Sequence, residues 1–306
     1  MYGTSALRTI VGNRQIFAAV STQLRACCQT AGMSSFDVLR ATALAISSCC
    51  VSTVALTAPV VAGDVSHHQL HIEGSGARTV ILESGLGDTL VVWKDIQPRI
   101  ATHCARTVSY TRAGYIGSDP ADGPRDSATI VQELREELDR RNIRPPYVLV
   151  GHSLGGLYMQ YFARNFPTEV AGLLLVDSTH WDQHMVIDTQ ANQQYLAQRE
   201  VTLFMPWIMR RELTDSAQAG EQVHSSPAAE DVRTIVLSST VAPKNGNAES
   251  LARAARLQDE IAADFPSSRH VFVTGAGHYI QRDKPEVVIN AARELAGCAE
   301  LQATRH

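Results

Sequence analysis

Apolar runs that suit β-strands alternate along the chain with longer segments in which apolar positions recur at helical spacing. The runs that predict strands lie at residues 66–74, 78–84, 106–111, 147–150, 171–178, 233–239 and 270–275. The segments that predict helices lie at residues 89–103, 126–142, 155–165, 248–265 and 284–298. Because most of these strands are apolar on both faces and are separated by helices, the pattern predicts an α/β fold, with a mostly parallel sheet and helices on both faces.

Residues 179–231 interrupt this alternation, because they contain no clear strand. We expect them to form a helical cap, inserted between two parts of one core, residues 64–178 and 232–306. Since ligands bind at the carboxyl edge of such sheets, three aromatic side chains of the insertion are candidates for substrate binding. They are Trp181, Phe204 and Trp207. The alternative is that these side chains only pack the cap onto the core.

The pentapeptide Gly151-His152-Ser153-Leu154-Gly155 joins an apolar strand directly to a helix. A nucleophile that projects from a parallel sheet lies on a very tight strand-to-helix turn, in a backbone conformation that is costly for any residue with a Cβ. Side chains two positions before and after it would collide across the turn, so both positions favour glycine. The pattern therefore predicts that Ser153 is a nucleophile, and the alternative is a glycine-rich turn that carries a solvated serine.

Residues 78–298 resemble the α/β-hydrolase fold family, whose sheet is of an eight-stranded type. The segment ILESGLGD at 81–88 resembles the family's loop that completes the oxyanion hole, and YTRAGYIGSD at 110–119 resembles a second family loop, with Thr111 where aspartate is usual. The resemblance implies that the backbone N–H groups of Leu86 and Leu154 form the oxyanion hole. We expect Arg112 to be structural and to brace the loop at 110–119.

A serine nucleophile needs a base within hydrogen-bond reach, and the family places serine, acid and histidine in that order along the chain. His278 follows the last predicted strand on a glycine-rich loop, so we expect it to be the base. Asp177 ends the run LLLVD at the carboxyl edge and is the favoured acid. Asp182 is the second candidate for the acid and Glu249 is the third.

These residues predict hydrolysis of an ester or related acyl bond, in a small and partly apolar substrate, through an acyl-enzyme on Ser153. The reaction requires no cofactor, and we expect no metal site. Amide or peptide hydrolysis, carbon–carbon bond hydrolysis, acyl transfer and ligand binding without turnover stay open as alternatives. A formal net charge of −4 and a sequence pI near 6.3 argue against a nucleic-acid partner. The sequence does not indicate which oligomeric state the protein has.

Residues 1–63 form a predicted leader, in which the stretch 41–63 contains no charged residue and directly follows Arg40. This pattern favours a cleaved signal peptide and export to the periplasm or the extracellular space, with Met33 as an alternative start. An uncleaved membrane anchor through 41–63, a lipid on Cys49 and a leader without a targeting role stay open.

Two cysteines, Cys104 and Cys298, lie outside the leader. Two lone cysteines are more often buried thiols than partners, but in an oxidising compartment they can pair. The family resemblance implies that the first and last helices of 78–298 lie on the same face of the sheet, which would permit a bridge.

Overall fold

The computed structural model describes residues 68–102, 104–183, 205–242 and 247–298. The chain divides into two units, Met1–Gly63 and Asp64–His306, and all the described residues belong to the second unit. The predictions for the leader, including the stretch 41–63, Met33 and Cys49, lie outside the described residues. Within the described ranges, no helix is both long and apolar enough to cross a lipid bilayer.

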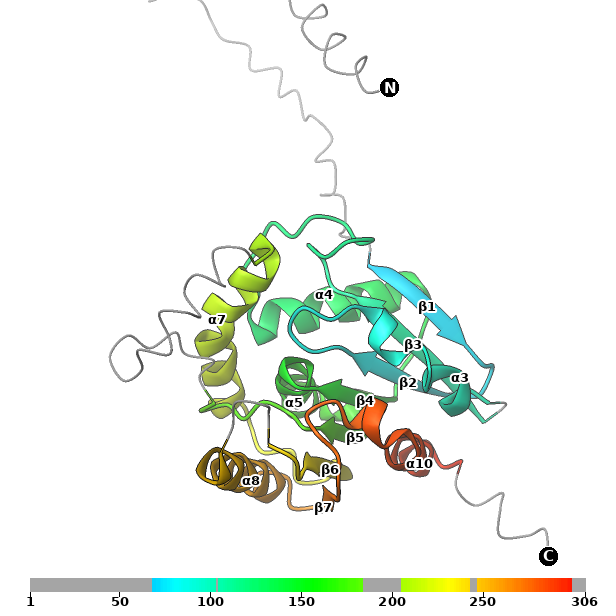
Figure 1. Cartoon of the computed structure of the whole chain (residues 1–306). Coiled ribbons are helices and arrows are strands. Elements are labelled where there is room, and N and C mark those ends of the chain that lie inside the picture. The colour runs from blue at the N-terminus through cyan, green and yellow to red at the C-terminus, as the bar shows by residue number, and fades with distance from the viewer. Residues whose placement is uncertain (1–67, 103, 184–204, 243–246, 299–306) are drawn as a thin grey trace, which may run out of the picture. The chain divides into compact units, whose positions relative to one another are not determined.

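The core of the second unit is a mostly parallel sheet (Figure 1). Its strands are β1 (Gln69–Glu73), β2 (Arg78–Glu83), β3 (Ala105–Thr111), β4 (Tyr147–His152), β5 (Val170–Val176), β6 (Thr234–Ser239) and β7 (Ser268–Val273). Their spatial order is β1-β3-β2-β4-β5-β6-β7, and only β1 runs antiparallel to its neighbour. The mostly parallel sheet is confirmed, and the described residues form seven strands where the family type has eight.

Helices cover both faces of this sheet, as the pattern predicts. One face packs against α4 (Ser127–Arg140), α5 (Leu154–Asn165), α7 (Trp207–His224) and α8 (Ala248–Ala263). The other packs against η1 (Leu90–Trp93), α3 (Gln97–Ile100), α9 (Ile280–Asp283) and α10 (Pro285–Leu295), while η2 (Pro167–Glu169) leads into β5. Successive strand side chains point to opposite faces, so in β4 Leu149 packs on the first face and Val148 and Val150 pack on the second.

Local signals explain where two of the helical segments begin. Asp126 caps α4, because its side chain accepts a hydrogen bond from the Thr129 N–H at 2.9 Å. The segment predicted as helical at 89–103, with Pro98 expected to bend the helix or set its start, forms η1 and α3 separately. Pro98 lies in the first turn of α3, where its missing N–H costs nothing, whereas inside a continuous helix its ring would clash with the preceding turn.

A disulfide joins Cys104, before β3, to Cys298, after α10, with their Cα atoms 5.9 Å apart. The sequence left the pairing open, and the fold brings the two residues together. Both sulfur-bearing side chains lie in the apolar layer that packs under α3 and α10.

The described part of the predicted cap contains α7, and residues 184–204 lie outside the described ranges. Near its start, Ile208 packs with Ala113 and Tyr115 from the loop after β3. Near its end, Ala219 and Val223 join the apolar core on the side of α4 and α5. The helix α7 therefore connects the carboxyl edge of the sheet with one of its helical layers.

Candidate active site

Ser153 lies on the turn between β4 and α5, with backbone angles φ 52° and ψ −124°. A positive φ is strained for a residue with a Cβ, so the turn around Ser153 has to be built tightly. A Cβ on Gly151 would lie 2.6 Å from the Gly156 Cα, and one on Gly155 would lie 2.4 Å from the Ser84 main-chain oxygen. These approaches explain why both flanking positions are glycine.

His278 lies between Ser153 and Asp177. Its Nε2 lies 3.0 Å from Ser153 Oγ, and its Nδ1 lies 2.7 Å from Asp177 Oδ2. Because an ionised carboxylate only accepts hydrogen bonds, Nδ1 carries the ring proton and Nε2 is left to accept from the serine hydroxyl. The structure thus brings together three side chains from the ends of three different strands.

Asp177 directly follows β5 and is held at both carboxylate oxygens. Its second oxygen, Oδ1, accepts a hydrogen bond from the Ser239 N–H at 2.8 Å, and its backbone has a positive φ of 44°. The other two predicted acids lie elsewhere. Asp182 is exposed on the loop after β5, and Glu249 is exposed in the first turn of α8.

The predicted oxyanion donors lie beside Ser153. Leu154 is the first residue of α5, so its N–H belongs to the positive end of the helix dipole. Leu86 follows Gly85, at which a Cβ would lie 3.2 Å from Ser153 Cβ. Among the described residues, neither the Leu86 N–H nor the Leu154 N–H makes a hydrogen bond. Their role as oxyanion donors stays a prediction.

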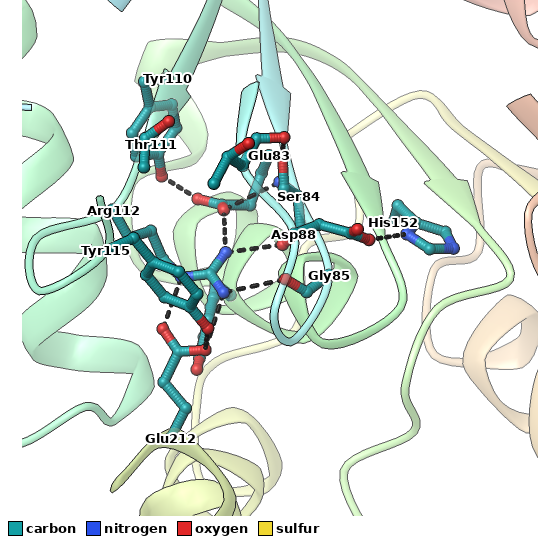
Figure 2. Close-up of polar contacts among 12 residues, drawn as sticks. Glu83, Ser84, Gly85, Asp88, Tyr110, Thr111, Arg112, Tyr115, His152 and Glu212 are labelled. Carbon is teal, nitrogen blue, oxygen red and sulfur yellow. Dashed lines mark hydrogen bonds and ion pairs between the residues drawn. The ribbon is translucent and has the colours of Figure 1, made fainter. Parts of the chain in front are cut away.

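His152 forms the floor below this site and is almost fully buried. Its Nε2 donates a hydrogen bond to the main-chain oxygen of His278 at 3.0 Å. Burial lowers the pKa of His152 to about 3, so its ring is neutral at pH 7. Nδ1 of His152 faces Asp88 Oδ2 at 3.8 Å (Figure 2), and burial raises the pKa of Asp88. The contact between His152 and Asp88 was not predicted from the sequence.

Arg112 holds the loop that carries Leu86, whereas the sequence predicted only that it braces the loop at 110–119. The guanidinium donates hydrogen bonds to the main-chain oxygens of Ser84 at 2.6 Å and Gly85 at 3.0 Å (Figure 2). Glu212 of α7 binds the same guanidinium. Glu212 was not predicted from the sequence. A usable signal was its place among small and apolar residues on one helical face, with Ile208, Ser216 and Val223.

The predicted substrate-binding residues occupy different surroundings. Trp181 stacks on the His224 ring, with 3.9 Å between centroids, and packs against the apolar core. Trp207 is half exposed and lines a surface hollow with Asp122 and Arg210. Phe204 lies outside the described residues. Their role in substrate binding stays a prediction.

In the ranges that the structure describes, no group of three His, Cys, Asp or Glu side chains could hold a metal ion.

Comparison with curated proteins finds several relatives over short segments. A Sodalis glossinidius protein named pimeloyl-(acyl-carrier protein) methyl ester esterase is 38% identical over 107 residues, 35% of this chain and 38% of that protein. Esterase YbfF of Escherichia coli is 22% identical over 199 residues, 58% of this chain and 77% of that protein. A Hormonema carpetanum protein named probable transporter efuK is 29% identical over 125 residues, 38% of this chain and 18% of that protein. The chain spans less than half the length of most curated relatives that it matches.

Comparison with solved structures supports the same fold. A thermophilic esterase from Thermogutta terrifontis superimposes with a TM-score of 0.52 at 17% identity, over 74% of this chain and 92% of that chain. The family model described as the alpha/beta hydrolase family matches residues 80–291. Since this match extends over more than half of the 306 residues, the chain belongs to the alpha/beta hydrolase family.

Proposed function

We propose that the protein is a serine hydrolase that cleaves a carboxylic ester of a small, partly apolar substrate through an acyl-enzyme on Ser153. The observation that carries this proposal is the position of His278, which lies 3.0 Å from Ser153 Oγ and 2.7 Å from Asp177 Oδ2. A hydroxyl, an imidazole and a carboxylate in this order form the arrangement that activates serine for attack on a carbonyl carbon.

In the proposed first step, His278 Nε2 accepts the hydroxyl proton of Ser153 while the serine oxygen attacks the ester carbonyl. The N–H groups of Leu86 and Leu154 donate hydrogen bonds to the resulting oxyanion, and one such donor is worth about 2.7–4 kcal/mol of transition-state stabilisation. The protonated His278 then gives its proton to the leaving alcohol as the carbon–oxygen bond breaks. Asp177 holds the ring in the required tautomer and stabilises its positive charge.

The proposed second step repeats this chemistry with water. His278 takes a proton from a water molecule, whose oxygen attacks the acyl carbon, and it returns that proton to Ser153 as the acid product leaves. The proposed steps need no cofactor.

Two observations support the choice of an ester substrate and the export of the protein. The Sodalis glossinidius and Escherichia coli relatives are both named esterases, which favours an ester substrate over an amide. The disulfide between Cys104 and Cys298 is of a kind that persists in oxidising compartments. We therefore also propose that the protein is exported.

The direct test is covalent labelling with a fluorophosphonate probe, followed by peptide mapping. We expect labelling of Ser153, loss of labelling in Ser153→Ala and normal labelling in Ser225→Ala, since Ser225 is exposed at the end of α7. Absence of labelling in the folded wild-type protein would favour ligand binding without turnover. A panel of p-nitrophenyl esters, amides and natural esters of graded chain length then separates ester hydrolysis from the competing activities of the fold.

A further inference from the structure

Arg112 is buried between the cap helix α7 and the loop that carries Leu86, with 1% of its side chain exposed. Its Nη1 donates to Glu83 Oε1 and to the Ser84 main-chain oxygen, both at 2.6 Å. Its Nη2 donates to the Gly85 main-chain oxygen at 3.0 Å (Figure 2). One side chain therefore fixes two successive carbonyl groups immediately before Leu86.

The Gly85 carbonyl oxygen accepts from Arg112 and, at 3.3 Å, from the Asp88 N–H, and its orientation fixes where the Leu86 N–H points. The Gly85 carbonyl and the Leu86 N–H belong to the same peptide group, which is planar and trans, so the two point in opposite directions. When Arg112 holds the carbonyl oxygen on one side of the loop, the N–H is directed to the other side. Gly85 lies against Ser153 on that loop, because a Cβ on Gly85 would come within 3.2 Å of Ser153 Cβ.

Arg112 is itself held by Glu212 of α7. The two carboxylate oxygens of Glu212 accept from Arg112 Nε at 2.6 Å and from Nη2 at 2.7 Å. This is the bidentate geometry in which an arginine is most strongly oriented. The Glu212 side chain is fully buried, so water does not replace either contact.

Tyr115 connects Glu212 to the other side of Leu86. The Tyr115 hydroxyl donates to Glu212 Oε2 at 2.7 Å and accepts from the Gly87 N–H at 3.0 Å. Figure 2 shows Tyr115 and Arg112 meeting at the same Glu212 carboxylate. The backbone on both sides of Leu86 is thus attached, through one intermediate side chain each, to a single carboxylate of the cap helix.

We infer that Glu212 is a positioning residue for the oxyanion hole, which acts through Arg112 and Tyr115 to orient the Leu86 N–H. The inference rests on the proposed function. Removing the negative charge of Glu212 leaves Glu83 as the remaining carboxylate partner of Arg112, and the guanidinium is drawn toward Glu83 and away from the Gly85 oxygen. The cap helix α7 and the loop that carries Leu86, here called the oxyanion loop, therefore behave as one unit.

The test compares Glu212→Gln with the wild-type protein in ester hydrolysis. We expect kcat to fall about tenfold to a hundredfold, the scale of a misplaced catalytic group, with KM changed less than about twofold because the substrate ground state gains little from an oxyanion donor. Binding of a boronic acid that forms a tetrahedral adduct on Ser153 should weaken by a similar factor. Tyr115→Phe removes only a hydroxyl and should show a smaller loss of the same kind.

The matched control is Asp215→Asn on the same helix. Asp215 anchors α7 to the core, because it accepts from the Arg125 N–H at 2.8 Å, but it does not contact the oxyanion loop. Equal losses of kcat in Glu212→Gln and Asp215→Asn would overturn the inference in favour of simple cap anchoring. Unchanged kcat in both Glu212→Gln and Tyr115→Phe would also overturn it. A wild-type protein that neither hydrolyses esters nor reacts with the probe would overturn the proposed function and this inference together.

Discussion

The Nε2 atom of His152 lies 3.0 Å from the main-chain oxygen of His278, although 126 positions separate the two residues. The residue before the proposed nucleophile thus holds the loop that carries the proposed base. The two rings also lie 4.8 Å apart, and the Tyr279 ring lies at the same distance from His152. Because the His152 ring is buried and neutral, we interpret its hydrogen bond to His278 as structural.

His152→Leu should lower kcat about twofold to tenfold, the value of one hydrogen bond that orients a reacting group. KM should change little, because the described contacts of His152 are with other residues of the site and serve to orient them. His152→Gln keeps an amide donor and should lose less activity than His152→Leu. Steady-state kinetics on one ester measure both constants. A larger loss in the glutamine variant than in the leucine variant would contradict this role.

Asp177→Asn should reduce kcat about ten-thousandfold, as in comparable triads. The asparagine oxygen can still accept from the Ser239 N–H, but the amide NH₂ then faces His278 Nδ1 and favours the wrong ring tautomer. Asp182→Asn serves as the control and should keep wild-type activity, since Asp182 lies exposed on the following loop. Normal turnover in Asp177→Asn would move the acid to another carboxylate.

The positions of Ser153, His278 and Asp177 could be predicted from sequence because Ser153 and Asp177 directly follow apolar strands and His278 lies on the short loop after β7. In a parallel sheet, the carboxyl ends of the strands lie along one edge, so residues that end separate strands converge there. The predicted proximity of these three side chains follows from topology alone and needs no knowledge of individual contacts.

Glu212 could not be placed in the same way. It lies 100 positions from Arg112, on a helix of the cap insertion that has no strand to fix its register. The pairing depends on how α7 packs against the loop after β3, which is set by apolar contacts such as that of Ile208 with Tyr115. The break between η1 and α3 was anticipated only in part, because Pro98 indicates a bend or a helix start whereas hydrophobic spacing does not show where η1 ends.

Gly156→Ala should destabilise the fold by about 1–3 kcal/mol, the usual cost of overpacking a tight interior. A Cβ at this position would lie 2.1 Å from Ser178 Oγ and 2.6 Å from Ser178 Cβ, so the residue after Asp177 would have to move. Denaturant unfolding measures the loss. Gly123→Ala is the control, since its Cβ would meet only Thr129 Cγ2 at an ordinary 3.6 Å. Equal stability of the two variants would show that the turn has more room than the structure indicates.

His68→Phe should make stability less dependent on pH between about 6.5 and 4. His68 is buried against the Tyr110 ring, and burial lowers its pKa from 6.5 to about 4. In this range the unfolded chain binds a proton that the folded protein does not, so the wild-type free energy of unfolding falls as the pH falls. The variant His68→Phe lacks this decrease in the free energy of unfolding.

Unfolding of the wild type and His68→Phe at pH 7.5 and pH 5 measures the difference. The variant should gain about 1–2 kcal/mol relative to the wild type on going to pH 5, from about 1.4 kcal/mol for each pKa unit. His71→Phe is the control, because His71 is exposed beside Glu73. Parallel pH profiles for the wild type and His68→Phe would show that His68 is not kept neutral by burial.

Replacing both Cys104 and Cys298 by alanine should lower the free energy of unfolding by about 2–5 kcal/mol. The bridge closes a loop of 194 positions, and the conformational entropy that it removes from the unfolded chain grows with the logarithm of that length. The same loss should appear when the wild-type protein is unfolded in the presence of a reductant, whereas the double variant should not respond to reductant. Thiol titration under denaturing conditions tests the bond itself, and free thiols at both positions in exported protein would show that it does not form.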